Sequence, residues 1–445
     1  MDCITPYRFF YLLMLFAILF VQGCATSAYK SMDMRAALAQ GRPDVALKAM
    51  EKESATDDVM VNMNRGILLR MLGDFNGSNQ ALELAKKKIE DLYATSLSEQ
   101  VGALMLNDET ISFEGDRYEQ VLVHAFKALN YIALGDMDAA RVEVLQSDVK
   151  MMEWGEAPEE DPFMRYLAGI VFEALGEYDE AIVSYRKAVE VYRATKDKQG
   201  LNIPLQLQND FLRLLSQQRR WNEFKHYKQK FAQGSWAMPD TRGMGELIVL
   251  LHNGMTPQRN QVSINTWSSE LSLNVRIALP AYSQPAKNLN PVRLTVGNEQ
   301  LLLETVENID GLARAALRAD MPVITTRAIA RAVVKKKSEK KIEERQGGLA
   351  QLAMFIVNQA TEIADTRCWN TLPQEIQIAR LFLPAGQQLV RLEVIGPGGT
   401  IVDVIELSAN ILQGKKTILS EHWTAPRPAA DKVAVNTESA TKVVF

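Results

Sequence analysis

The residue types that carry catalysis or bind metals are few in this chain and lie far apart. None of its four histidines stands at metal-ligand spacing from a second histidine or a cysteine; they are His124, His226, His252 and His422. The chain also lacks the glycine-framed serine of hydrolases and the glycine-rich loops that hold phosphates or dinucleotides. We therefore predict no metal site, no cofactor and no catalytic residue.

Cys368 is one of only three cysteines, and it follows Arg367. A neighbouring guanidinium lowers the pKa of an accessible thiol and makes it reactive. The alternative is a buried structural cysteine, which we expect here. The acidic residues between 107 and 120 lack the order of a calcium-binding loop, and we expect a solvated loop there.

Cys24 is the cysteine whose neighbours point to a definite reaction. An apolar run from Phe9 to Val21 precedes it, which is too short to cross a bilayer and is typical of a signal peptide. With Gly23 before it, Cys24 resembles the lipobox cysteine of bacterial lipoproteins. That resemblance implies a signal peptide over residues 1–23, acylation of Cys24, for example by palmitate, and a lipidated linker over 24–30.

The residue after the lipobox cysteine implies the destination. By the sorting rule of bacterial lipoproteins, Ala25 in place of aspartate implies the outer membrane of a Gram-negative cell, with the protein facing the periplasm. Cleavage removes Cys3, so the mature chain has no pair of thiols for an internal disulfide and must be stabilised by its core. The formal net charge of −4 gives no indication of nucleic-acid binding.

A basic patch is the strongest local charge feature. Clusters of Lys and Arg attract anionic surfaces, so one interpretation is binding of an anionic envelope polymer. The other is a solvated helix face of mixed charge. The members of the basic patch are Arg327, Arg331, Lys335, Lys336, Lys337, Lys340 and Lys341.

The elements that must position these residues fall into two halves. Residues 31–240 repeat their apolar positions at helical spacing, and a Leu-Gly-acid phrase recurs at Gly73, Gly135 and Gly176. Fainter copies stand at Gly41 and at Arg219 to Trp221. Each phrase predicts a helical hairpin. The interval before Gly135 is nearly twice the usual repeat of about 34 residues, and we interpret the excess as an insertion.

Small residues recur where paired helices of such hairpins cross closely. They are Gly66, Ser78 and Ala85 in one unit, Ala128, Ala140 and Ser147 in the next, and Gly169, Ala181 and Ala188 in the third. On these positions the first half resembles tetratricopeptide-repeat proteins. The resemblance implies stacked repeats with a groove that binds protein segments.

The sequence pattern of the second half is typical of β-strands. Residues 241–425 predict an α+β domain whose sheet is split by a helical insertion at about 311–365, and residues 426–445 predict a flexible tail. The fold class is therefore multidomain, with all-α tetratricopeptide-like repeats followed by an α+β domain.

Two phrases, at residues 118–144 and 364–386, resemble the hallmark segments of an uncharacterised family of bacterial tetratricopeptide-repeat-containing outer-membrane lipoproteins. The family has no assigned activity, so the resemblance implies fold and location only. Matched residue by residue, it makes the polar members of both phrases candidates for partner binding. They are Tyr118, Glu119, His124, Asn130, Arg141, Asp365, Arg367, Trp369 and Arg380.

The function we expect is that of an adaptor without enzymatic activity. Lipid holds the chain at the outer membrane, and the repeat groove binds an envelope protein, in cell-envelope assembly or in regulation of cell-wall enzymes. Two alternatives stay open. One is a cell-wall hydrolase or transferase with its site around His252, Asp365 and Arg367, and the other is binding of anionic polymer by the basic patch.

Overall fold

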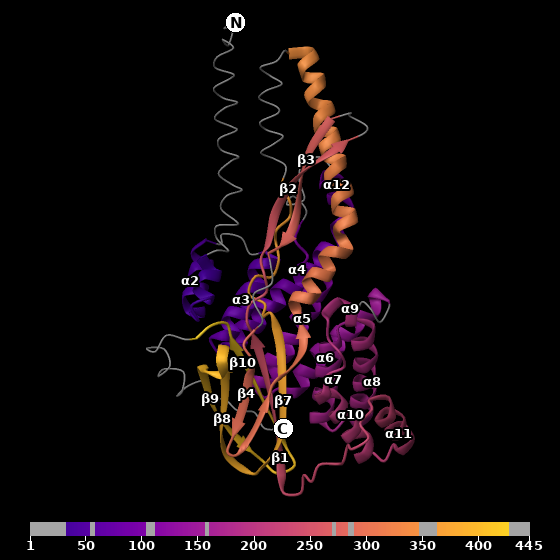
Figure 1. Cartoon of the computed structure of the whole chain (residues 1–445). Coiled ribbons are helices and arrows are strands. Elements are labelled where there is room, and N and C mark those ends of the chain that lie inside the picture. Colours follow the sequence, from indigo (N-terminus) through magenta and orange to yellow (C-terminus); the bar gives the residue numbers. More distant parts are fainter. Residues whose placement is uncertain are drawn as a thin grey trace.

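A computed structural model describes residues 33–53, 58–103, 112–155, 160–268, 273–283, 289–346 and 363–426 (Figure 1). The predicted signal peptide, Cys24, the lipidated linker and all but the first residue of the predicted tail lie outside these ranges. None of the helices among the described residues is both long and apolar enough to span a membrane.

The described residues of the first half form five helical hairpins, most of whose helices are labelled in Figure 1. Each has a first and a second helix joined by a tight loop. The pairs are residues 33–38 with α2 (Pro43–Glu53), α3 (Val59–Met71) with α4 (Phe75–Ala103), α5 (Arg117–Leu134) with α6 (Met137–Trp154), α7 (Pro162–Leu175) with α8 (Tyr178–Ala194), and α10 (Leu205–Gln217) with α11 (Trp221–Lys230). A single-turn helix, α9 (Lys196–Gln199), connects the last two hairpins.

Every hairpin loop contains one residue in the left-handed region. It is a glycine in the first four, with φ between 69° and 85°, whereas Arg219 takes this conformation in the last, with φ of 56°. Glycine pays no steric penalty there. The last hairpin is therefore faint in the sequence because an arginine occupies the glycine position.

The small residues lie where the paired helices touch. A β-carbon added to Gly169 would stand 2.2 Å from the ring of Tyr185, and one added to Gly66 would stand 2.6 Å from Leu82. Ala128, Ala140 and Ser147 are fully buried. The close helix crossings expected of tetratricopeptide repeats are thus present in three successive hairpins.

The excess length before Gly135 is in part a long helix. α4 has 29 residues and runs to Ala103. α5 then begins after a capping box, in which the Asp116 side chain accepts from the backbone of Glu119 and the Glu119 side chain accepts from the backbone of Asp116.

Two four-stranded sheets build the core of the second half. One has the order β10-β1-β7-β6 and the other β5-β4-β8-β9. The strands of the first are β1 (Met244–Asn253), β6 (Glu304–Asn308), β7 (Glu375–Pro384) and β10 (Lys416–Trp423), and those of the second are β4 (Val292–Val296), β5 (Glu299–Leu302), β8 (Gly386–Ile395) and β9 (Ile401–Ile411). The second half therefore has two packed sheets where we expected one.

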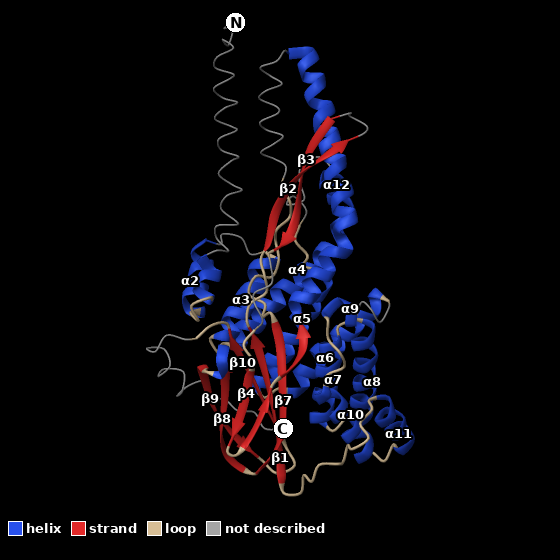
Figure 2. Ribbon diagram, viewed as in Figure 1, coloured by secondary structure: helices blue, strands red, loops and turns tan. Residues whose placement is uncertain are grey.

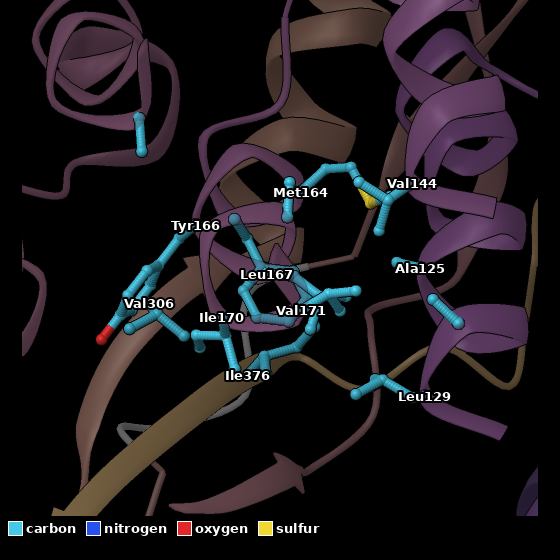
Figure 3. Packing of buried hydrophobic residues seen from close by; sticks show 14 of the residues in the cluster. Ala125, Leu129, Val144, Met164, Tyr166, Leu167, Ile170, Val171, Val306 and Ile376 are labelled. Atoms are coloured by element: carbon cyan, nitrogen blue, oxygen red, sulfur yellow. The ribbon is translucent and has the colours of Figure 1, made fainter. Parts of the chain in front are cut away.

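β1 packs against the second sheet on one face and against the helical repeats on the other. Its odd residues, such as Leu247 and Val249, belong to the core between the two sheets, and its even residues, such as Ile248 and Leu250, belong to the core shared with the helices. Figure 3 shows Ile170 of α7 beside Val306 and Ile376 of the sheet. A strand buried on both faces needs a continuous apolar run, which β1 has.

An arm extends from this body (Figure 2). It consists of the two-stranded ribbon of β2 (Arg259–Ser268) and β3 (Leu273–Tyr282) and of the helix α12 (Ile309–Gln346), which the chain forms between β6 and β7. Ile277 of β3 packs on Ala328 and Ala332 of α12. We call β2, β3 and α12 the arm below.

Candidate functional site

The two hallmark phrases meet in the structure although they are far apart in the sequence. The backbone N–H of Trp369 donates to Glu119 Oε1 over 2.7 Å, and the rings of Trp369 and Phe126 have centroids 5.8 Å apart. Glu119 and Trp369 are each 1% exposed. These candidates therefore join the repeats to the second half and are closed to an outside partner.

A network around Glu119 fixes the base of the arm. Burial and the neighbouring Asp116 raise the pKa of Glu119 to about 7. Arg259, the first residue of β2, donates to Asp116 over 2.7 Å. Burial also raises the pKa of the Tyr118 hydroxyl well above its ordinary value. Asp365 accepts from Arg367 over 2.8 Å, so these two partly exposed residues pair with each other.

Arg380 is the centre of a buried ionic cluster between α7, α10 and the first sheet. It contacts Glu173 at 3.1 Å, Asp210 at 2.8 Å and also Glu246. Arg213 and Lys416 complete the cluster, which holds three acidic and three basic side chains. Burial opposes the ionisation of Glu246, but Arg380 and Arg213 outweigh it and lower the pKa of Glu246 to about 2.

His124 and Asn130 hold helices of the repeats together. His124 Nδ1 lies 2.8 Å from Glu143 Oε2 of α6, and burial lowers the pKa of His124 despite this carboxylate. Asn130 Nδ2 donates to Ser78 Oγ over 2.8 Å. Both residues are buried, so neither is accessible to an outside partner. Arg141, by contrast, is partly exposed and pairs with Glu177 at 2.9 Å.

The residues proposed for an alternative hydrolase do not form an accessible site. His252 is fully buried, stacks on His422 with ring centroids 4.2 Å apart, and has a pKa lowered to about 3 by burial and by Arg70. A polymeric substrate has no route to this imidazole in the folded chain. Asp365 is paired with Arg367 instead. Cys368 is buried as expected, and burial raises its pKa to about 11.

The basic patch is not one exposed face. Arg331 is 1% exposed and lies among the buried residues of α12, whereas Arg327 is partly exposed. The side chains of the patch lysines lie outside the described residues. Burial of Arg331 corrects its assignment to a surface that attracts polymers.

The first helices of the hairpins turn toward the sheet. α5 packs near β10, α7 near β6 and α10 near β7, and their apolar side chains share one core with β1, β6, β7 and β10. We call the surface of these first helices the inner face. The chain's own sheet covers it, which corrects the expectation that a groove there receives a partner segment.

The second helices leave a different surface, which we call the outer face. Four apolar side chains of α6 lie exposed on it, at successive spacings of three, four and three residues. They are Val142 at 47%, Leu145 at 39%, Val149 at 58% and Met152 at 62% exposure, and we call them the α6 stripe.

The α6 stripe was not among the sites predicted from the sequence. The signal was present, because α6 also buries Ala140, Val144 and Met151 and therefore has apolar residues on two faces. A soluble helix with one packed face needs only one apolar stripe. Among the described residues, no group of three or more potential His, Cys, Asp or Glu ligands could hold a metal.

Comparison with known proteins supports the assignment of tetratricopeptide repeats in the first half. Residues 164–195 match the tetratricopeptide repeat family, and these residues span most of the α7–α8 hairpin. No curated protein compared with the chain matches it.

Several solved structures match about half of this chain at low similarity. MamA (AMB-1) is 17% identical, with 48% of this chain and 93% of that chain covered and a TM-score of 0.30. The apo form of RapI is 13% identical, with 46% and 68% covered and a TM-score of 0.34. A further MamA structure is 13% identical, with 48% and 98% covered and a TM-score of 0.31.

Proposed function

We propose that this protein is a non-enzymatic adaptor that binds a protein partner through the outer face of its repeats. The observation that carries the proposal is the exposure of the four apolar side chains of the α6 stripe. Large apolar side chains grouped on one surface of a soluble protein mark interaction sites. The inner face is excluded because the sheet already fills it.

The spacing of the α6 stripe defines the chemistry of the partner. Val142, Leu145, Val149 and Met152 follow the three-four alternation of a helix–helix seam. The matching ligand is an amphipathic helix with apolar residues at the same spacing. Covering each of these side chains contributes roughly 1–2 kcal/mol, because they are already partly buried. Such a seam gives modest affinity, which suits a reversible adaptor.

The lipobox around Cys24 supports the second part of the proposal, that lipid anchors the adaptor at the outer membrane, facing the periplasm. In that setting the partner is an envelope protein, in envelope assembly or in the regulation of wall-building enzymes. Mass spectrometry of the mature N-terminus tests the anchor. We expect an acylated Cys24, and an unmodified N-terminus at another residue contradicts it.

A crosslinked pull-down from intact cells tests the binding surface. The variant Val149→Asp with Met152→Asp places two charges in the C-terminal half of the α6 stripe, and we expect it to lose the partner that the wild type recovers. The matched control is Leu389→Asp, because Leu389 is 48% exposed on β8, away from the α6 stripe. Equal recovery with both variants contradicts the proposal.

Salt separates the adaptor from the polymer-binding alternative. Attraction between a basic patch and an anionic polymer weakens as ionic strength rises, because salt screens exposed charges. An apolar helix seam is nearly insensitive to the same change. We expect the recovered partner to persist at high salt.

A further inference from the structure

β2 has an outer edge, which is the edge that faces away from β3. Within the part of the chain that the structure describes, β2 pairs with β3 alone. Residues 260–265 are all exposed, and the apolar members Val262 and Ile264 are 46% and 42% exposed. An exposed strand edge offers a row of backbone donors and acceptors to another strand.

The hydrogen-bond pattern tells which residues point outward. Ser283 N–H donates to the Gln258 carbonyl over 3.0 Å, one step before the pairing of Arg259 with Tyr282. Residues alternate between bonded and non-bonded pairs along an antiparallel ladder. The even residues of β2 therefore bond to β3, and the backbone groups of Gln261, Ser263 and Asn265 point to the open edge.

The two edges of the ribbon are protected differently. β3 contains Pro280, which has no N–H to offer to an additional strand. β2 contains no proline, lysine or acidic residue. Those are the residues by which natural proteins block edge pairing. The edge of β2 is thus open to pairing while that of β3 is guarded.

We infer that a second copy of this chain pairs with β2 in antiparallel orientation, with Ser263 opposite Ser263 of the copy. This register makes the outward-pointing residues the bonded pairs of the new ladder. It also places Val262 opposite Ile264 and Gln261 opposite Asn265. Apolar side chains meet apolar ones, and no charged pair stands directly opposite. Gln261 meets Asn265 while its side-chain oxygen also accepts from Ala364 N–H over 2.9 Å within its own chain. The strand is complementary to itself under a two-fold axis.

The geometry of the arm is compatible with this pairing. The ribbon extends away from the stacked sheets (Figure 2), so the two bodies lie at opposite ends of the paired strands. The two ribbons form one four-stranded sheet with both copies of α12 on the same face. Val262 and Ile264 of β2 share that face with Ile277 of β3, which already packs on α12.

Disulfide crosslinking of the full chain tests the register. In Ser263→Cys the two thiols face each other across the two-fold axis, at a Cα separation of about 5.5 Å that suits a disulfide. We expect this variant to form covalent dimers on mild oxidation. Asn298→Cys, in the exposed β4–β5 turn, is the matched control and, like the wild type, should form no covalent dimer.

Charge exchange tests the edge independently of the introduced thiol. The variant Val262→Lys with Ile264→Lys places like charges opposite each other, as does Val262→Glu with Ile264→Glu. We expect each alone to lose the dimer in light scattering, and an equal mixture to recover it. Circular dichroism checks that both remain folded, which is expected because the two residues are exposed. The inference is overturned if Ser263→Cys crosslinks no more than Asn298→Cys, or if mixing restores no dimer.

Discussion

The inner and outer faces of the same repeat array have opposite chemistry. The inner face buries charged side chains in a balanced cluster around Arg380 and packs its apolar residues on the sheet. The outer face leaves the α6 stripe exposed and carries surface pairs such as Arg141 with Glu177. A repeat array can therefore use one face for its own fold and keep the other for binding.

The difference also shows how to interpret polar residues in the hallmark phrases. Glu119, Asn130 and Arg380 are buried and satisfied by contacts within the chain. Such residues hold the two halves in one arrangement, whereas exposed apolar residues are available to a partner. Substitutions on the inner face should therefore affect stability, and those on the outer face should affect binding.

Loss of Arg380 should reduce the stability of the protein more than any other substitution proposed below. Arg380→Met leaves Glu173, Asp210 and Glu246 with too little positive charge in a buried site. We expect the free energy of unfolding to fall by roughly 3–5 kcal/mol, measured by urea denaturation. Arg391→Met is the control, because Arg391 forms an exposed pair with Glu406, and its effect should stay below about 1 kcal/mol.

Asp161 is a buried carboxyl group outside the balanced cluster around Arg380, and it predicts a pH-dependent change in stability. Burial raises the pKa of Asp161 to about 6, above an unfolded value of about 3.9. The folded chain therefore binds this proton more tightly, and the stability that it contributes below pH 4 is lost as the pH rises through 6.

Asp161→Asn keeps an oxygen that can accept from Met164 N–H and removes the charge. We expect it to stabilise the protein by up to about 3 kcal/mol above pH 6 and to have little effect below pH 4. Urea denaturation above pH 6 and below pH 4 measures this change in the free energy of unfolding. A stabilisation of equal size at both pH values would contradict the raised pKa of Asp161 as its cause.

Gly169 tests the helix crossings within the repeats. Gly169→Ala adds a β-carbon 2.2 Å from the ring of Tyr185, and such overpacking costs about 1–3 kcal/mol. Gly234→Ala is the matched control, since no atom lies within 4 Å of the added carbon and φ is not positive. Equal effects of both substitutions on thermal unfolding would contradict the close approach of α7 and α8 at Gly169.

Val149 should give the smallest change in stability. Val149→Asp alters a side chain that is 58% exposed, so we expect the free energy of unfolding to stay within about 0.5 kcal/mol of the wild type. A loss of several times that size in urea denaturation would mean that the α6 stripe serves the fold and not a partner.

The repeats were largely predictable because their signals are local. A loop glycine and small residues at fixed spacing depend only on how two neighbouring helices cross, as at Gly169 and Tyr185. The alternation of β4 and β8 likewise follows from strands with their own turn residues. Arg219 shows the limit, because a residue other than glycine in the left-handed conformation hides the same loop.

The candidate site was not predictable in the same way. Glu119 and Trp369 are 250 residues apart, and nothing near either one indicates that they touch. Polar residues in a shared phrase were interpreted as binding residues, but their burial depends on how the sheet docks on the helices. The parallel pairing of β10 with β1 was not predictable for a related reason, since it is a long-range contact.

Site-specific photo-crosslinking in living cells tests the central claim most directly. A photoreactive amino acid at Val149 probes the outer face, and one at Leu389 probes an exposed site on the second half. We predict that the probe at position 149 captures a discrete protein and that the probe at position 389 does not. Capture of the same protein at position 389 alone, with none at 149, would contradict the assignment of the outer face as the binding surface.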